Sequence, residues 1–391
     1  MSDQVWVDYV RAENHARWDR PFPVRYLLVA EDWDEEGQDW HLLGRCAAVE
    51  GLFADPPPPP REVLAMRGCA PGARPGPLGP TSIVGRAAEP QDDAWWTLLD
   101  AEVLAVTPHA DDPALVDVTL GAGVQLSYGS ACGPGRTFLR FELTPRHDVV
   151  TAACATLPGL AVERPEPAQA HLRLIGCEPA EPMRRILRKR KGAPPTYTEL
   201  WALDAHGRRA AVVSTGFDVE WTRPSVLGGA LVDVLLSVDA DLLPGSAARA
   251  AWRHWLPGRP RKAGSWRGLT AEQKQAWLLA ALRVFHGFGP DRSGGEYHLD
   301  GAGVQDEAGL HCAIGEAIRG PGGYYGGGLA PLLDCLCGGF GVVPPFTLVW
   351  HDFATTEREL AEASEGPVIA PGYPEELARA LEQHGVTVVR A

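Results

Sequence analysis

The chain has 391 residues, which is too long for one typical hydrophobic core, so more than one domain is expected. Its net charge of −14 argues against nucleic acid as the main partner, because phosphate binding needs a basic surface. The sequence has no run of about 20 apolar residues and no signal-peptide pattern after Met1, so we expect no membrane partner and a cytoplasmic location.

Residues 1–165 are predicted to form a β-rich domain of unknown function. Two apolar runs, Val24–Ala30 and His41–Phe53, flank an acidic turn. A proline run at 56–60 predicts a surface spacer. Further along, Trp95–Thr107 and Ala114–Leu120 predict a β-hairpin.

The segment between these last two runs leaves an enzymatic alternative open. It reads Pro108-His109-Ala110-Asp111-Asp112-Pro113 and resembles the zinc-binding opening of LmbE-type N-acetylglucosaminyl deacetylases. That resemblance implies a zinc-dependent hydrolase, with His and Asp as ligands. However, Pro113 replaces the usual Glu and no HxxH pair supplies a further ligand. We therefore favour a plain hairpin turn, and expect no metal, no cofactor and no enzymatic activity.

Residues 166–265 are predicted to form a second β-rich module or a continuation of the first. Its candidate start is Pro165–Pro167, and its strands include Thr196–Leu203 and Ala210–Val219. The strand–turn–strand units at 24–54 and 196–219 share an acidic turn, which leaves an internal duplication open. Residues 266–290 are predicted to be a helical connector, because Thr270 and Gln273 have the spacing of a capping box.

Residues 291–391 alternate between strand and helix patterns. Strands are predicted at Glu296–Leu299, Phe346–Trp350 and Val386–Val389, and helices at Glu307–Ile318 and Glu375–His384. This alternation predicts a small α/β domain with a three-stranded parallel sheet. The fold class is thus multidomain, with a β-rich (α+β) region followed by this small domain.

Within that last domain, the segment 323–336 is a glycine-rich loop leading into a short helix. Leu329, Leu332, Leu333 and Leu336 follow helical spacing and predict one apolar stripe. At about 100° per residue, Asp334 lies roughly 150° from the centre of that stripe. We therefore expect a helix that buries its leucines and presents one carboxylate to solvent.

The order of motifs in this domain resembles the barstar family of ribonuclease inhibitors. The residues that carry the resemblance are Tyr324-Tyr325-Gly326, Leu329, Asp334-Cys335-Leu336, Gly338, Pro345, Leu348, Trp350 and Phe353. The resemblance covers about residues 295–391. It implies the barstar fold and a helix that masks a ribonuclease active site.

The resemblance also implies a set of partner-binding residues. They are Tyr324, Tyr325, Gly326, Leu333, Asp334, Gly338 and Phe340, with Asp334 in the role of a phosphate mimic. The sequence departs from the family pattern at Ala330 and Ala380, where the family has acids, and at Leu333 and Gly339, where it has tryptophan. These departures imply a different cognate nuclease or a weaker complex. The alternative is a barstar fold reused for another protein contact.

Charge supports a basic protein partner. Residues 293–391 hold fourteen Asp and Glu against four Arg and no Lys, a net −10 out of the −14 of the chain. A basic secreted ribonuclease or nuclease toxin would be attracted to such a surface. The eight cysteines are scattered without a CxxC pair, and we expect reduced structural thiols.

Overall fold

The computed structural model describes most of the chain. The described residues are 23–34, 37–55, 58–78, 81–89, 92–126, 137–144, 150, 152–160, 168–189, 197–214, 216–284, 290–362 and 372–391. They fall into two compact units. The first unit comprises Met1–Pro56, Pro167–Glu357 and Pro374–Ala391, and the second, here called the inserted unit, comprises Pro57–Glu166 with Arg358–Tyr373.

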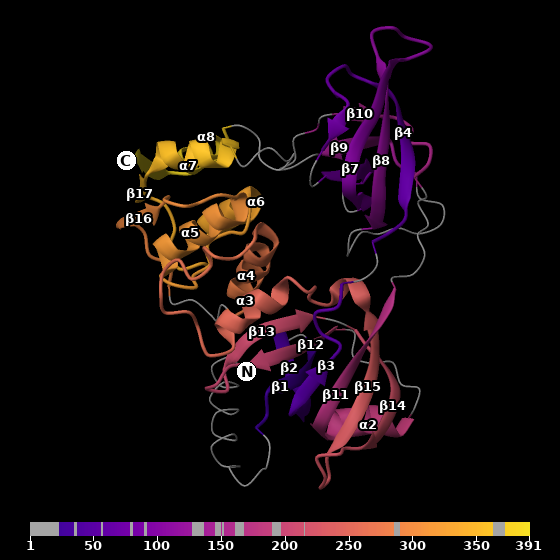
Figure 1. Cartoon of the computed structure of the whole chain (residues 1–391), viewed down its shortest axis with the longest axis vertical. Coiled ribbons are helices and arrows are strands. Elements are labelled where there is room, and N and C mark those ends of the chain that lie inside the picture. The colour runs from indigo at the N-terminus through magenta and orange to yellow at the C-terminus, as the bar shows by residue number, and fades with distance from the viewer. Residues whose placement is uncertain are drawn as a thin grey trace. The chain divides into compact units, whose positions relative to one another are not determined.

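The first unit contains an antiparallel sheet built from two distant stretches of sequence (Figure 1). Its strand order is β13-β12-β1-β2-β11-β15-β14, and β3 pairs with β11. The bounds are β1 Tyr26–Asp34, β2 Gly37–Cys46, β3 Ala48–Glu50, β11 Gln169–Pro179, β12 Tyr197–Leu203, β13 Arg209–Ser214, β14 Asp218–Pro224 and β15 Val232–Asp239. Helix α2, Glu181–Lys189, follows β11.

The two compact units divide at Glu166/Pro167, next to the expected boundary, but the residues before Pro57 belong to the same unit as those after Glu166. Strand β1 pairs with β12 and β2 pairs with β11, so the strands on both sides of the inserted unit share one hydrophobic core. The physical reason is that apolar residues of the early strands, such as Leu28 and Leu43, share one buried core with residues of the later strands, such as Leu174 and Leu236. The candidate boundary at Pro165–Pro167 lies outside the described residues.

The inserted unit is a curled antiparallel sheet. Its strand order is β10-β9-β6-β7-β8-β4, and a bridge between Arg67 and Thr156 brings the two ends together. The bounds are β4 Arg61–Cys69, β5 Gly76–Pro77, β6 Thr81–Arg86, β7 Ala94–Pro108, β8 Val116–Leu126, β9 Arg140–Thr144 and β10 Ala152–Cys154. The predicted hairpin is confirmed as β7 and β8, which pair from Trp96–Leu126 to Pro108–Val116.

Two helices lie between the first sheet and the C-terminal elements within the first unit (Figure 1). They are α3, Ala248–Trp255, and α4, Ala271–Val284, and a 3-10 turn at Ala240–Leu242 precedes them. The capping box is present: the Thr270 N–H donates to Gln273 Oε1 at 3.1 Å, and the Gln273 N–H donates to Thr270 Oγ1 at 3.3 Å. Helix α4 packs on α3, on β13 and on the first helix of the C-terminal domain.

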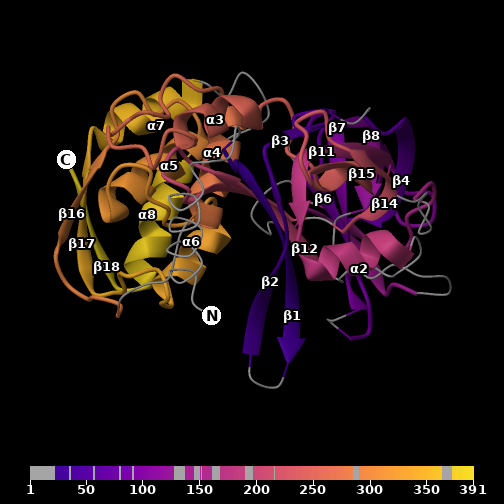
Figure 2. The same ribbon diagram turned by 90° about the horizontal axis from the view of Figure 1, so that it is seen from below.

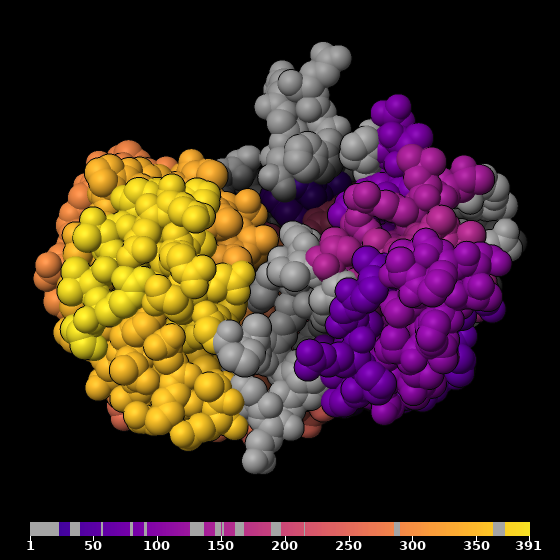
Figure 3. All heavy atoms as spheres, turned by 90° about the horizontal axis from the view of Figure 1, so that it is seen from above, coloured from indigo at the N-terminus to yellow at the C-terminus, as the bar shows by residue number. Residues whose placement is uncertain are grey.

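The C-terminal elements form the predicted α/β arrangement. They are β16 Glu296–Asp300, α5 Glu307–Arg319, α6 Leu329–Leu336, β17 Phe346–His351, α7 Phe353–Glu362, α8 Tyr373–Gln383 and β18 Val386–Arg390. The strands are parallel in the order β16-β17-β18, which confirms the predicted sheet. Figure 2 shows α5, α6 and α8 on one side of these strands, and Figure 3 shows the last elements of the chain, in yellow, at the surface.

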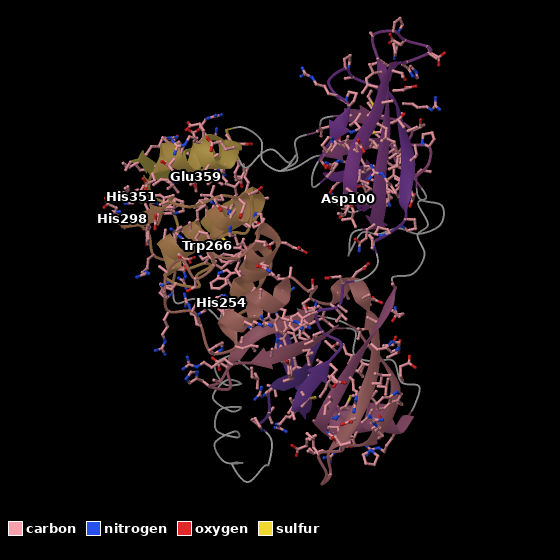
Figure 4. All side chains as sticks on the ribbon, viewed as in Figure 1. Asp100, His254, Trp266, His298, His351 and Glu359 are labelled. Atoms are coloured by element: carbon pink, nitrogen blue, oxygen red, sulfur yellow. The ribbon has the colours of Figure 1, made fainter. Side chains whose placement is uncertain are left out.

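The other face of the parallel sheet is exposed. Glu296, His298 and His351 lie on it, and His298 Nδ1 is 3.0 Å from His351 Nε2. The two imidazole rings stack and lie together at the edge of the domain (Figure 4). The described helices thus lie on one face of the sheet, which gives the described part of the domain two layers.

Candidate functional site

Helix α6 separates a buried face from an exposed face. Leu332, Cys335 and Leu336 are buried, and the exposed residues of the helix and its C-terminal end are Ala330, Pro331, Asp334 and Cys337. Leu333 is only half-buried, so the apolar stripe is centred one position away from the one that we predicted, and Cys335 completes it. Asp334 is exposed as expected from the helical spacing.

The carboxylate of Asp334 has no bonding partner among the described residues. Among the residues that the structure describes, none forms a hydrogen bond or an ion pair with this carboxylate. Its charge is nevertheless felt by the buried face, because burial, and then the nearby Asp334 charge, raise the pKa of Cys335 to about 12. The helix therefore presents a solvated anion above a neutral core.

The two tyrosines of the loop point inward. Tyr325 is fully buried, and its hydroxyl donates to the carbonyl oxygen of Val342 at 2.7 Å. Tyr324 is also buried and packs against Phe340 with ring centroids 6.1 Å apart. Burial raises the pKa of Tyr324 to about 12. Both side chains were expected at a partner surface, whereas here they support the loop from beneath, because their rings fill the space under α6.

Close backbone packing fixes the loop. Gly326 has φ +88°, and a Cβ there would lie 2.5 Å from Leu332 Cα. A Cβ on Gly315 of α5 would lie 2.4 Å from the carbonyl oxygen of Gly323. Only glycine allows these approaches, so the entry into α6 has one tightly defined path.

The segment after α6 is held by a residue that the sequence reasoning missed. The Asp291 carboxylate accepts hydrogen bonds from the backbone N–H groups of Gly339, at 2.8 Å, and Gly341, at 2.7 Å. Gly338 and Phe340 are half-buried beside this contact. Asp291 lies about fifty positions earlier in the chain, and no local pattern marks it as a partner of these glycines.

Helix α4 flanks the site. Lys274 is buried, and its ammonium lies 2.5 Å from Asp306, whose carboxylate also accepts from the N–H of Gly309 at the start of α5. One turn further along α4, Leu278 Cβ would be 3.9 Å from a Cβ on Gly327. The connector thus contacts both the first helix of the domain and the loop before α6.

The comparison with known families decides what this domain is. Residues 296–368 match the family described as Barstar (barnase inhibitor). The C-terminal segment of the chain is a barstar-family domain. Neither the curated proteins nor the solved structures provide a match to the chain.

The barstar-family domain extends structurally beyond the matched residues. Strand β18, Val386–Arg390, lies after residue 368 and completes the parallel sheet by pairing with β17. The described part of α8 also follows the matched segment and buries Leu377 and Leu381. The sheet and its helices therefore need the chain up to its last described residues.

In the hairpin with the zinc-site resemblance, His109 lies near two carboxylates. His109 Nδ1 lies 2.8 Å from Asp117 Oδ1 on β8, and His109 Nε2 lies 3.9 Å from the carboxylate of Asp111, which is almost fully exposed. The Gly68 N–H also donates to Asp117, at 2.9 Å. The described residues contain no cluster of three or more His, Cys, Asp or Glu side chains that could bind a metal ion.

A membrane-spanning helix must be both long and apolar. None of the helices that the structure describes meets both requirements.

Proposed function

We propose that the barstar-family domain inhibits a microbial-type ribonuclease by covering its active site with the exposed face of α6 and the Tyr–Gly loop. Such an enzyme holds a phosphodiester with Arg, Lys and His side chains, so its pocket is a cluster of cations. A carboxylate on a rigid helix can take the place of the phosphate. The observation that carries the proposal is the exposed Asp334 carboxylate, which has no partner among the described residues.

The surroundings of Asp334 suit this role. Its helix is fixed from below by the Tyr325–Val342 hydrogen bond and from one end by Asp291. A preorganised anion loses little conformational freedom on binding, which favours affinity. We assign contacts with the nuclease to Asp334, Leu333, Gly338 and Phe340, and a supporting role beneath the loop to Tyr324 and Tyr325, with Gly326 defining its path.

The proposed partner is a basic secreted ribonuclease or nuclease toxin, met inside the cell that makes the inhibitor. The net charge of −10 over residues 293–391 would accelerate their encounter at low salt. The association rate should therefore fall as ionic strength rises, because exposed charges are screened beyond about 10 Å at 0.1 M salt.

The test is a titration of ribonuclease activity. A panel of secreted bacterial ribonucleases is mixed with the full chain, with Asp334→Asn, and with Asp218→Asn as a matched control. Asp218 is an exposed acid on β14, in the antiparallel sheet. Removing one partner of a buried interfacial charge pair costs 2–5 kcal/mol in measured systems that include barnase and barstar, so Asp334→Asn should bind at least about 30-fold more weakly.

Two results would contradict the proposal. Equal inhibition by the original chain and Asp334→Asn would remove Asp334 from the mechanism. Absence of inhibition across a broad panel, together with capture of a partner that is not a nuclease, would favour the alternative in which the fold serves another protein contact.

A further inference from the structure

Two cysteines lie opposite each other in the first sheet. Strands β2 and β11 are antiparallel, with Arg45 opposite Glu178 and Gly44 opposite Pro179. One further step along this register places Cys46 opposite Cys177. Both side chains are fully buried, and a hydrogen bond joins the two thiols.

The inserted unit repeats the arrangement at another place. Arg67 and Thr156 form an antiparallel bridge, and Cys69 and Cys154 lie two residues further along each strand, beyond the register shift that β4 carries between Met66 and Cys69. These two thiols are also buried and hydrogen-bonded to each other. Each compact unit therefore contains one directly opposed pair of cysteines in its own core.

Opposed residues of antiparallel strands have Cα atoms about 4.5–5.5 Å apart. A disulfide bond requires a Cα separation of about 4.4–6.8 Å. We infer that Cys46–Cys177 and Cys69–Cys154 are two disulfide sites, which close when a peroxide is the oxidant and open again in thiol reductants.

The chemistry balances with hydrogen peroxide. In each pair, one cysteine sulfur attacks one peroxide oxygen, the O–O bond breaks, and a sulfenic acid and one water form. The sulfur of the opposite cysteine then attacks that sulfenic sulfur, its proton leaves with the hydroxyl as a second water, and the S–S bond remains.

The two sites are nested in the sequence. Cys46 precedes the inserted strands and Cys177 follows them, while Cys69 and Cys154 lie on the first and last of those strands. The outer bond would join β2, which precedes the inserted strands, to β11, which follows them. The inner bond would join the first and last strands of the inserted unit. Each of the two bonds would then link a strand near the start of the inserted unit to a strand near its end.

The barstar-family domain provides internal controls. Its cysteines are Cys312, Cys335 and Cys337. Cys335 and Cys337 are only one residue apart around the end of α6, where one thiol is buried and the other exposed, and burial raises the pKa of Cys312. We expect these three thiols to stay free of intramolecular disulfides.

The experiment is a disulfide map of the full chain. The protein is treated with hydrogen peroxide or with dithiothreitol a few degrees below its unfolding midpoint, so that the buried strands open transiently. It is then alkylated in denaturant, digested and examined by mass spectrometry. The expected result is two linked peptide pairs, Cys46–Cys177 and Cys69–Cys154, each lighter by two hydrogens and absent after reduction. The inference is overturned if these four cysteines are all alkylated after peroxide treatment, or if they link to other cysteines.

A stability measurement gives a second readout. Closing the inner bond should raise the unfolding midpoint of the inserted unit by about 10 °C, because the unfolded chain is constrained. Cys69→Ala should remove only the part of this difference that the inner bond contributes, whereas the double variant Cys46→Ala/Cys69→Ala should abolish it entirely and Cys337→Ala should leave it unchanged. An oxidised–reduced difference that persists in the double variant would contradict the assignment, and the peptide map of the unchanged chain decides the matter if that variant does not fold.

Discussion

Two aspartates of the first unit, Asp233 in the antiparallel sheet and Asp334 in the barstar-family domain, have opposite surroundings. In the antiparallel sheet, Asp233 is fully buried, and its carboxylate accepts from the Arg173 guanidinium at 2.8 Å and from the Gly176 N–H at 3.1 Å. Burial acts to raise the pKa of Asp233, but these hydrogen bonds outweigh it and the pKa is lowered. In the barstar-family domain, Asp334 is exposed and no described residue pairs with it. A buried acid stabilises its own fold, whereas an exposed one remains available to another molecule.

The largest expected effect on stability comes from Arg173. Arg173→Met would leave the Asp233 charge buried without its main partner and should lower the free energy of unfolding by about 3 kcal/mol. Arg223→Met is the matched control, because Arg223 is half exposed and lies 3.7 Å from the same carboxylate. Chemical denaturation measures both variants. If both variants lose similar unfolding free energy, the pair between Arg173 and the buried Asp233 carboxylate does not stabilise the sheet more than the exposed contact of Arg223 does.

The next effect concerns the loop that positions Asp334. Gly326→Ala forces a side chain onto a backbone with φ +88° and against Leu332, so it should cost about 2–3 kcal/mol and weaken nuclease binding. Gly328→Ala is the control, since only Pro331 Cδ lies near, at 3.8 Å. Thermal unfolding and inhibition are measured together. Unchanged inhibition by Gly326→Ala would mean that the loop path does not set the position of α6.

A smaller effect is expected from the buried tyrosine. Tyr325→Phe removes the donor to the Val342 carbonyl and should cost about 1–2 kcal/mol of unfolding free energy. Tyr297→Phe, at a half-buried position on β16, should change stability by less than about 0.5 kcal/mol. If the two substitutions prove equivalent in denaturant titrations, the Tyr325 hydroxyl does not anchor the loop.

The smallest effect concerns pH. Burial raises the pKa of Glu316, even though its carboxylate accepts from the Gly264 N–H at 2.8 Å. Because the folded-state pKa lies above the unfolded one, ionisation of Glu316 disfavours the folded state above that folded-state pKa. Its contribution becomes more favourable as pH falls through it. The carboxyls with lowered pKa, such as Asp233, lose stability as the pH falls, and Glu316 opposes that loss. Glu316→Gln should therefore lose stability more steeply than the unchanged chain on acidification, and a profile parallel to that of the unchanged chain would contradict this assignment.

The sequence predicted the two regions unequally, for a physical reason. In the barstar-family domain, strands and helices alternate locally, so periodicity located β16, β17 and β18 within one or two residues. The exposure of Asp334 also followed from helical spacing, although Cys335 rather than Leu333 completes the buried stripe.

The antiparallel sheet could not be predicted in the same way. Its strand β2 pairs with β11, more than 120 residues later, and local patterns do not encode such pairing. The supports of the site at Asp291 and Lys274 were missed for the same reason, since each contacts residues more than thirty positions away.

The salt bridge between Lys274 and Asp306 has a consequence for how the inhibitor can be dissected. The family match begins at residue 296, but α4 precedes it and covers part of α5. A fragment cut at the start of the match would uncover apolar surface and leave Asp306 without its ammonium. The shortest autonomous inhibitor should therefore begin before Thr270, so that the helix supplied by the neighbouring region travels with the domain that it supports.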